Sequence, residues 1–120
     1  MKGPVDKRVY RAISIAVVCM LTIMPTGVSG YHNANMQGTL TLLAVYSDGD
    51  YIYMQLDNQP TSHPGCSPTY FVIAEDVPAN RREAMFARLM TAYVTGEAIT
   101  IGYDNAGNCA HSYIRVHRVG

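Results

Sequence analysis

The residues most able to do chemistry in this chain are its cysteines, its histidines and a group of tyrosines set among acids and amides. Of the three cysteines, Cys19 lies in an apolar N-terminal run, while Cys66 and Cys109 lie in polar, loop-like segments. Cysteines pair in oxidising compartments and stay reduced in the cytosol. The compartment must therefore be inferred before the cysteines can be interpreted.

The N-terminal segment has the three parts of a secretory signal peptide: a basic start, a short apolar core and a small-residue exit. Lysines and arginines within residues 2–11 precede the apolar run Ala12–Met24, and Val28-Ser29-Gly30 supplies small residues at a cleavage site. The thirteen-residue run is shorter than the roughly 20 residues that a spanning helix needs. We expect residues 1–30 to be a signal peptide rather than a retained membrane anchor. Residues 31–120 are then one exported domain, periplasmic or secreted, with no membrane span after cleavage.

Cys66 and Cys109 are the two cysteines left in residues 31–120, so an oxidising compartment fixes their pairing as one disulfide. Two reduced thiols or a metal-binding pair are the alternatives, and the same compartment disfavours both. The bond would close a loop of about 43 residues, which the chain-entropy relation values at about 4 kcal/mol. A domain this small has a small core and often needs such a covalent link.

Loss of the N-terminal segment changes the charge of the chain. The whole chain carries nine Lys/Arg and nine Asp/Glu. Residues 1–30 hold four of the bases and one of the acids, which leaves five arginines, no lysine, eight acids and a net charge of −3. Phosphate binding needs clustered Lys and Arg. We therefore expect no nucleic-acid partner.

The histidines do not form a recognisable catalytic or metal-binding motif. They are His32, His63, His111 and His117, and none stands in an HExxH spacing. A disulfide could bring His63 and His111 together, but two imidazoles without a nearby carboxylate make a poor metal site. The chain has no GxSxG motif, and a disulfide-bonded cysteine cannot act as a nucleophile. We expect no catalytic residue, no metal and no cofactor, and hence no enzyme.

Five segments are predicted to be strands because β-branched, aromatic and alternating apolar residues fill them. They are Thr39–Tyr46, Tyr51–Leu56, Tyr70–Ala74, Ala98–Tyr103 and Tyr113–Val119. An Asp-Gly turn over Ser47–Asp50 joins the first two as a hairpin. An interrupted alternation at Leu42-Leu43 indicates a bulge in the first. Residues 31–37, Asn58–Thr69 and Asp104–Ser112 are expected to be irregular.

One helix is predicted between the third and fourth strands. Asn80 with Glu83 three residues later matches a capping box, and Gly96 suits the C-terminal cap. Apolar residues at helical spacing predict a core-facing stripe, formed by Met85, Phe86, Leu89, Met90, Tyr93 and Val94.

The resulting order, β-β-β-α-β-β, is that of the OB-fold, a five-stranded Greek-key barrel. In that fold the third and fifth strands run parallel and adjacent. Cys66 and Cys109 each lie just before one of these strands, so the topology would bring them within disulfide reach. The fold class is therefore mainly β with one helix, and the alternative is an α+β open sheet with one packed helix.

A ligand-binding surface is predicted from the tyrosines. OB barrels bind oligonucleotides or oligosaccharides on their second and third strands and the loops after strands one and four. Tyrosine with acids and amides suits sugars, which present an apolar ring face and polar edges. The alternative is an ordinary strand surface or an oligomer contact. The candidate ligand-binding residues are Tyr51, Tyr53, Asp48, Asp50, Asp104, Asn105 and Asn108.

An exported, disulfide-bonded OB barrel of this size resembles the B subunits of bacterial AB5 toxins. The segment YFVIAEDVPANRREAMFARLMTAYVTGEAITIGYDNAGNC, residues 70–109, is also similar to small secreted proteins of Gram-negative bacteria with a helix, a glycine, a strand and a late cysteine. The toxin resemblance implies a pentameric ring that binds cell-surface glycans. It assigns no contact to any residue of this chain.

Together these features predict an exported, non-catalytic binding domain that forms a homo-oligomer and binds glycans. The alternative is a monomeric periplasmic interaction or inhibitor module that binds an envelope protein through a loop such as Asn58–Thr69.

Overall fold

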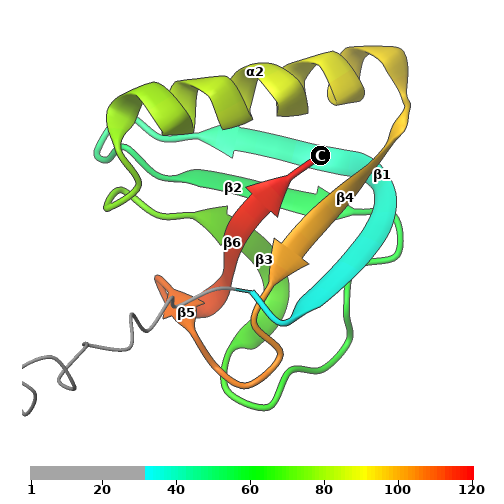
Figure 1. Cartoon of the computed structure of the whole chain (residues 1–120), viewed down its shortest axis with the longest axis vertical. Helices are drawn as coiled ribbons and strands as arrows, with labels where there is room; N and C mark the ends of the chain where they lie inside the picture. Colours follow the sequence, from blue (N-terminus) through cyan, green and yellow to red (C-terminus); the bar gives the residue numbers. More distant parts are fainter. Residues whose placement is uncertain (1–31) are drawn as a thin grey trace, which may run out of the picture.

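The computed structural model describes residues 32–120, and the predicted signal peptide lies outside the described residues. A small β-barrel carries one helix across one of its ends (Figure 1). The elements are β1 (Ala34–Val45), β2 (Ile52–Leu56), β3 (Ser67–Ile73), α2 (Ala79–Thr95), β4 (Ala98–Tyr103), β5 (Cys109–Ala110) and β6 (Tyr113–Val119). Within residues 32–120, no helix is both long enough and apolar enough to cross a membrane.

The strands close into a barrel. Neighbouring strands pair in the order β3-β2-β1-β4-β6, and β3 then pairs with β6 to complete the circle. The β3–β6 pair is parallel, and every other pair is antiparallel. The two-residue strand β5 adds to the edge of β6. This closed arrangement confirms the OB-like barrel and decides against the open sheet.

Strand β1 is shared between two neighbours. Its first half, Ala34 to Thr39, pairs with β4, and its second half, Leu40 to Val45, pairs with β2. The register shifts between Leu40 and Leu42, where the second pairing begins, which confirms the predicted bulge. The strand begins five residues earlier than predicted, because pairing with β4 overrides the weak local preference of its first residues.

Buried side chains and outward-facing side chains alternate along strand β2. Ile52, Met54 and Leu56 are buried, and they face Phe71, Ile73 and Leu89 in the core. Tyr51 and Tyr53 alternate with them and point outward, as predicted. The side chains of a strand project alternately to its two faces, so the hairpin places its tyrosines outside the barrel.

Helix α2 begins and packs differently from the prediction. The capping-box prediction at Asn80 is wrong: Pro78 occupies the cap position, with no side-chain capping bond. Pro78 has a non-helical ψ of 138°, and it has no N–H that would be left unpaired just before the helix. The predicted C-terminal cap is confirmed, since Gly96 is left-handed with φ 72° and its N–H donates to the carbonyl of Ala92.

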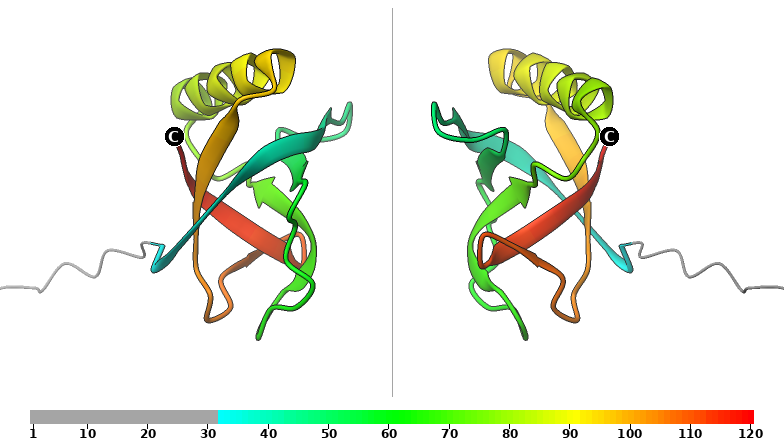
Figure 2. Two further views of the ribbon diagram at one scale, coloured as in Figure 1. Left: turned by 90° about the vertical axis from the view of Figure 1, so that its right-hand side faces the viewer. Right: turned by 90° about the vertical axis from the view of Figure 1, so that its left-hand side faces the viewer.

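Only part of the predicted helical stripe reaches the core. Leu89 and Ala92 are buried, and Met85 and Phe86 are partly buried against the same core. The remaining predicted positions are exposed: Met90, Tyr93 and Val94. The helix lies over the end of a narrow barrel (Figure 2), so only one line of residues can face inward.

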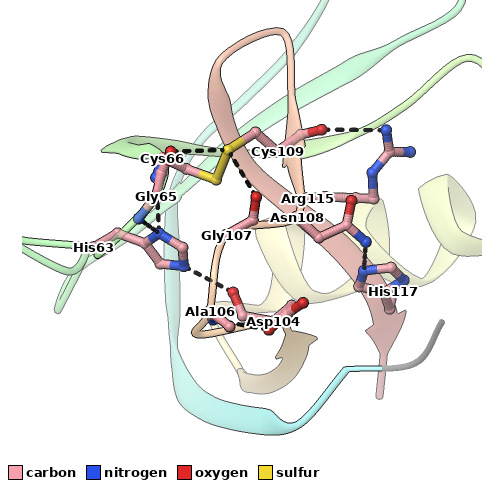
Figure 3. Close-up of a disulfide and its surroundings, with 10 residues drawn as sticks. All are labelled: His63, Gly65, Cys66, Asp104, Ala106, Gly107, Asn108, Cys109, Arg115 and His117. Atoms are coloured by element: carbon pink, nitrogen blue, oxygen red, sulfur yellow. Dashed lines mark hydrogen bonds between the residues drawn. A yellow bond between two sulfur atoms is a disulfide. The ribbon is translucent and has the colours of Figure 1, made fainter.

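The predicted disulfide between Cys66 and Cys109 is present, with the two Cα atoms 5.6 Å apart. It joins Cys66, just before β3, to Cys109, the first residue of β5, and the loops that precede these strands also touch at Gly65 and Gly107 (Figure 3). A Cβ added to Gly65 would lie 2.6 Å from the Cα of Gly107, so glycine is needed for this close approach. His63 ties the loops further, since its ring bonds the N–H of Cys66 at 2.9 Å and the carbonyl of Asp104 at 2.7 Å.

The segment between β4 and β6 is more ordered than predicted. Strand β5 and β6 form a tight hairpin whose two turn residues, His111 and Ser112, have φ of 51° and 71°. Two consecutive positive φ values are typical of a type I′ turn, which normally uses Asn or Gly. The sequence lacks those residues here, so the hairpin was not predicted.

Candidate functional site

Five tyrosines and one histidine pack together on the outside of the barrel. They come from β2, β3, β6, the β1–β2 turn and the β5–β6 turn, and they are Tyr46, Tyr51, Tyr53, Tyr70, Tyr113 and His111. We call this set the tyrosine face. Most of it rests on a second cluster of buried apolar residues, Val72, Ala74 and Ala110, on the outer side of β3 and β5.

Tyr53 is the centre of the tyrosine face. Its ring centroid lies 5.1 Å from that of Tyr46, 5.3 Å from Tyr51, 5.4 Å from Tyr70 and 5.5 Å from Tyr113. These spacings fall in the range that aromatic pairs prefer. The Tyr53–Tyr70 pair is stacked, and most of the others are edge-on or tilted. The rings therefore form one continuous aromatic surface.

Strand register explains why the rings meet. Tyr53 pairs with Val72 across β2 and β3, and Tyr70 stands two residues before Val72, on the same outward face. Tyr113 precedes the buried Ile114, so it points outward from β6 next to β3. The parallel β3–β6 pairing thus brings Tyr113 to within 5.1 Å of Tyr70, measured between ring centroids.

Polar groups line the edge of the tyrosine face. The Tyr51 hydroxyl donates to Asp48 Oδ1 at 2.8 Å, and this hydrogen bond is the main reason that the pKa of Tyr51 rises to about 12. His111 Nε2 lies 2.7 Å from Glu75 Oε2, and that contact lowers the pKa of Glu75. The His111 ring also lies 4.4 Å from the Tyr51 ring. Burial, followed by the charge of neighbouring tyrosines, raises the pKa of Tyr53.

No family model, curated protein or solved structure matches this chain. Within residues 32–120, no three His, Cys, Asp or Glu side chains gather closely enough to hold a metal ion.

The predicted ligand-binding residues divide into two sets. Tyr51, Tyr53 and Asp48 belong to the tyrosine face or its edge, and Asp50 lies beside them in the β1–β2 turn. The other three lie in the β4–β5 loop next to the disulfide: Asp104, Asn105 and Asn108. Figures 1 and 2 show the β1–β2 turn near the helix and the β4–β5 loop at the opposite end of the barrel. The structure does not bring the two sets together.

The β4–β5 loop uses its polar groups to hold itself in place. Asp104 Oδ1 accepts from the N–H of Ala106 at 2.8 Å, and the N–H of Asn105 donates to Asn33 Oδ1 at 2.9 Å. The side chain of Asn108 lies 3.0 Å from His117 Nε2. The Asp104 carboxylate, the Asn108 amide and the backbone N–H of Asn105 therefore each have an intramolecular partner.

Five residues of the site and its edge were not among the predicted ligand-binding residues: Tyr46, Tyr70, Tyr113, His111 and Glu75. Tyr70 and Tyr113 begin the third and fifth predicted strands, which the OB topology places side by side. The expected adjacency of these two strands is the sequence feature that could have identified both tyrosines. His111 and Glu75 lie 36 residues apart in irregular segments, and only the folded chain shows that they meet.

A surface pocket of about 290 Å³ adjoins the tyrosine face between the β1–β2 turn and the start of α2. Tyr46 and Tyr51 form one wall, Phe86 of α2 contributes an apolar surface, and Asp50, Arg82 and Glu83 supply charge. A second pocket of about 380 Å³ lies between the start of α2 and β6, lined by Arg81, Arg115, His117 and Asp76 among others.

Proposed function

We propose that this chain is an exported, non-catalytic binding domain that takes carbohydrate on the tyrosine face. The observation that carries the proposal is the continuous surface of five tyrosine rings around Tyr53. A tyrosine offers an apolar ring face for a sugar ring and a hydroxyl for the sugar's polar edge. The carboxylates of Asp48 and Glu75 add hydrogen-bond acceptors at the rim of this surface.

The rigidity of the tyrosine face supports a role in binding. Four of its five tyrosines, all except Tyr46, pack on Val72, Ala74 and Ala110, which are nearly or fully buried. Tyrosine has only two side-chain torsions, and rings already held by their neighbours lose little further freedom when a ligand binds. A face ordered in advance can therefore bind a weakly interacting ligand with little entropic cost.

The charge around the face supports carbohydrate over nucleic acid. Asp48 lies on the rim beside Tyr51, and Glu75 lies beside His111. Nearby Arg115 donates to both carboxylate oxygens of Asp76, at 2.8 and 3.0 Å, and so is already neutralised. A phosphate backbone needs a surplus of positive charge on the protein. Asp48, Glu75, Asp76 and Arg115 together carry no such surplus.

Export is supported by the disulfide. The Cys66–Cys109 bond requires an oxidising compartment to form and persist. Together with the N-terminal sequence, it favours a periplasmic or secreted protein. We propose that residues 1–30 direct this export and are then removed.

Assembly into a ring is part of the proposal. Met90, Tyr93 and Val94 form an exposed apolar strip on the outer side of α2, and such a strip suits contact between copies of a chain. Several copies would present several tyrosine faces, and multivalency raises overall affinity without any new contact. Weak individual sugar sites would then suffice.

A second candidate function is protein binding or inhibition through the loop Asn58–Thr69. The observation that favours it is the way this loop is held. Gln59 accepts from the N–H of Leu56 at 3.0 Å and donates to the carbonyl of Pro68 at 2.8 Å, and the disulfide holds the far end of the loop. A loop fixed in one conformation loses little entropy when a partner binds.

A glycan array probed with protein exported from the full chain tests the first proposal. We expect a defined group of glycans to bind, and we expect Tyr53→Ala to lose roughly tenfold or more in affinity for them. Arg118→Ala, a truncation of an exposed β6 side chain outside both the tyrosine face and the apolar strip of α2, is the control and should leave glycan binding unchanged. Absence of any glycan signal, with one envelope protein captured instead, would favour the second candidate.

A further inference from the structure

The pocket beside the tyrosine face combines aromatic rings with carboxylates. Tyr46, Tyr51 and Phe86 line it, and Asp50 and Glu83 reach it from the β1–β2 turn and from α2. Tyr46 and Tyr51 also belong to the tyrosine face. The tyrosine face is therefore continuous with this pocket.

The two carboxylates are open to a ligand. The Asp50 side chain is 80% exposed, and it forms one long ion pair, with Arg82 Nη2 at 3.7 Å, which is beyond hydrogen-bond distance. Glu83 is exposed on the first turns of the helix and makes no salt bridge within residues 32–120. Both carboxylates therefore lie at the surface of the pocket, where a ligand can reach them.

Arg82 is the one basic residue that lines this pocket, and its guanidinium group is largely shielded from solvent. Its side chain is only 15% exposed. Its Nη1 donates to the carbonyls of Glu75 at 3.1 Å and Val77 at 2.7 Å. With two carboxylates against one guanidinium the pocket has a net negative charge, and Asp48 on the neighbouring rim adds to it.

We infer that the ligand of the tyrosine face is an amino sugar whose ammonium group occupies this pocket. An ammonium group is attracted both by carboxylates and by the faces of aromatic rings. A neutral sugar gains neither attraction, and an acidic sugar is repelled. This inference rests on the proposed carbohydrate function and names the class of sugar that the face prefers.

The test compares two oligosaccharides of equal length, a glucosamine oligomer and an N-acetylglucosamine oligomer. Acetylation removes the positive charge and keeps the sugar ring. Isothermal titration of the exported protein should give about tenfold tighter binding of the glucosamine oligomer at low salt. The difference should shrink as salt is raised, because exposed charges are screened.

Two variants locate the effect. Asp50→Asn keeps the shape of the side chain and removes its charge, and it should weaken glucosamine binding about three- to fivefold without changing N-acetylglucosamine binding. Glu97→Gln removes the same charge at the far end of the helix, where Glu97 pairs with Arg88 at 2.8 Å. It should leave both affinities unchanged.

The outcomes separate the inference from the function on which it rests. Equal binding of the two oligomers, or an Asp50→Asn effect no larger than that of Glu97→Gln, overturns the amino-sugar inference and leaves the carbohydrate function standing. Binding of neither oligomer or any other glycan overturns both. Tighter binding of a lysine-rich peptide than of the glucosamine oligomer also overturns the inference, since the ammonium site would then belong to a protein ligand.

Discussion

His117 shows most clearly how burial in this fold controls a single side chain. Burial lowers its pKa, and the neighbouring charge of Arg115 lowers it further. Its Nε2 lies 3.0 Å from the side-chain amide nitrogen of Asn108, and it can accept this hydrogen bond only while it is unprotonated. Folding therefore favours the neutral form of His117 over the protonated form.

The lowered pKa of His117 makes stability depend on pH. The unfolded chain takes up a proton near pH 6.5, whereas the folded chain resists it. Stability should therefore fall as the pH drops from about 7.5 to 5.5. Urea unfolding at several pH values should show a smaller fall in the free energy of unfolding for His117→Gln than for the wild type.

Glu75 does not contribute to this pH dependence. Its pKa is also lowered, so its contribution to stability is lost only below about pH 4.5, outside this window. An equal pH dependence in the wild type and His117→Gln would contradict this assignment.

At the residue scale, the sequence predicts the centre of the tyrosine face better than its edges. Tyr51 and Tyr53 follow from simple alternation around Ile52. Tyr113 does not, because its position depends on which strands lie side by side. Asp104 was predicted to share a binding surface with these tyrosines. Its loop lies at the other end of the barrel, where the Asp104 carbonyl accepts a hydrogen bond from His63 Nε2. Loop positions follow tertiary contacts, which local sequence does not encode.

At the element scale, the central structural feature is the disulfide that joins the loops before β3 and β5. The bond links residues separated by 43 positions. Removing it in Cys66→Ser/Cys109→Ser should lower the free energy of unfolding by about 4 kcal/mol, because the unfolded chain gains conformational freedom. Urea unfolding of the double variant against the wild type measures this loss.

A reducing agent is the matched control for the disulfide variant. It should lower the stability of the wild type to that of Cys66→Ser/Cys109→Ser and leave the double variant unchanged. A loss well below about 1 kcal/mol would show that the barrel holds the two loops together without the bond.

The remaining differences between the predicted and observed elements have two physical causes. Strand β1 extends back to Ala34, and β5 forms at Cys109–Ala110, because neighbouring strands supply hydrogen-bond partners that local sequence does not show. The helix begins at Ala79 rather than after Asn80, with Pro78 as the residue at its cap, where the missing N–H of proline leaves no unpaired donor. Strand and helix types were correct wherever periodicity was strong, and the differences lie at their ends.

At the scale of the whole molecule, the topology could be predicted because the strand order and the cysteine positions indicate the same fold. The parallel pairing of β3 and β6, including Ser67 with Tyr113, brings the residues beside Cys66 and Cys109 together. Closure of the barrel then turns the outer sides of β2, β3 and β6 into one surface. The tyrosine face is therefore a product of closure, and no single segment of the sequence contains it.

The central claim is that carbohydrate binds on the tyrosine face, and the most direct test is NMR of the protein with labelled tyrosine rings. Addition of a glycan selected on the array should shift the ring signals of Tyr51 and Tyr53 at ligand concentrations that leave Tyr93 and Tyr103 unchanged. Tyr93 lies on the exposed helix surface, and Tyr103 packs against Phe71, so both serve as internal controls. Shifts confined to Tyr93, or no shift in any tyrosine when glycan is bound, would contradict the claim.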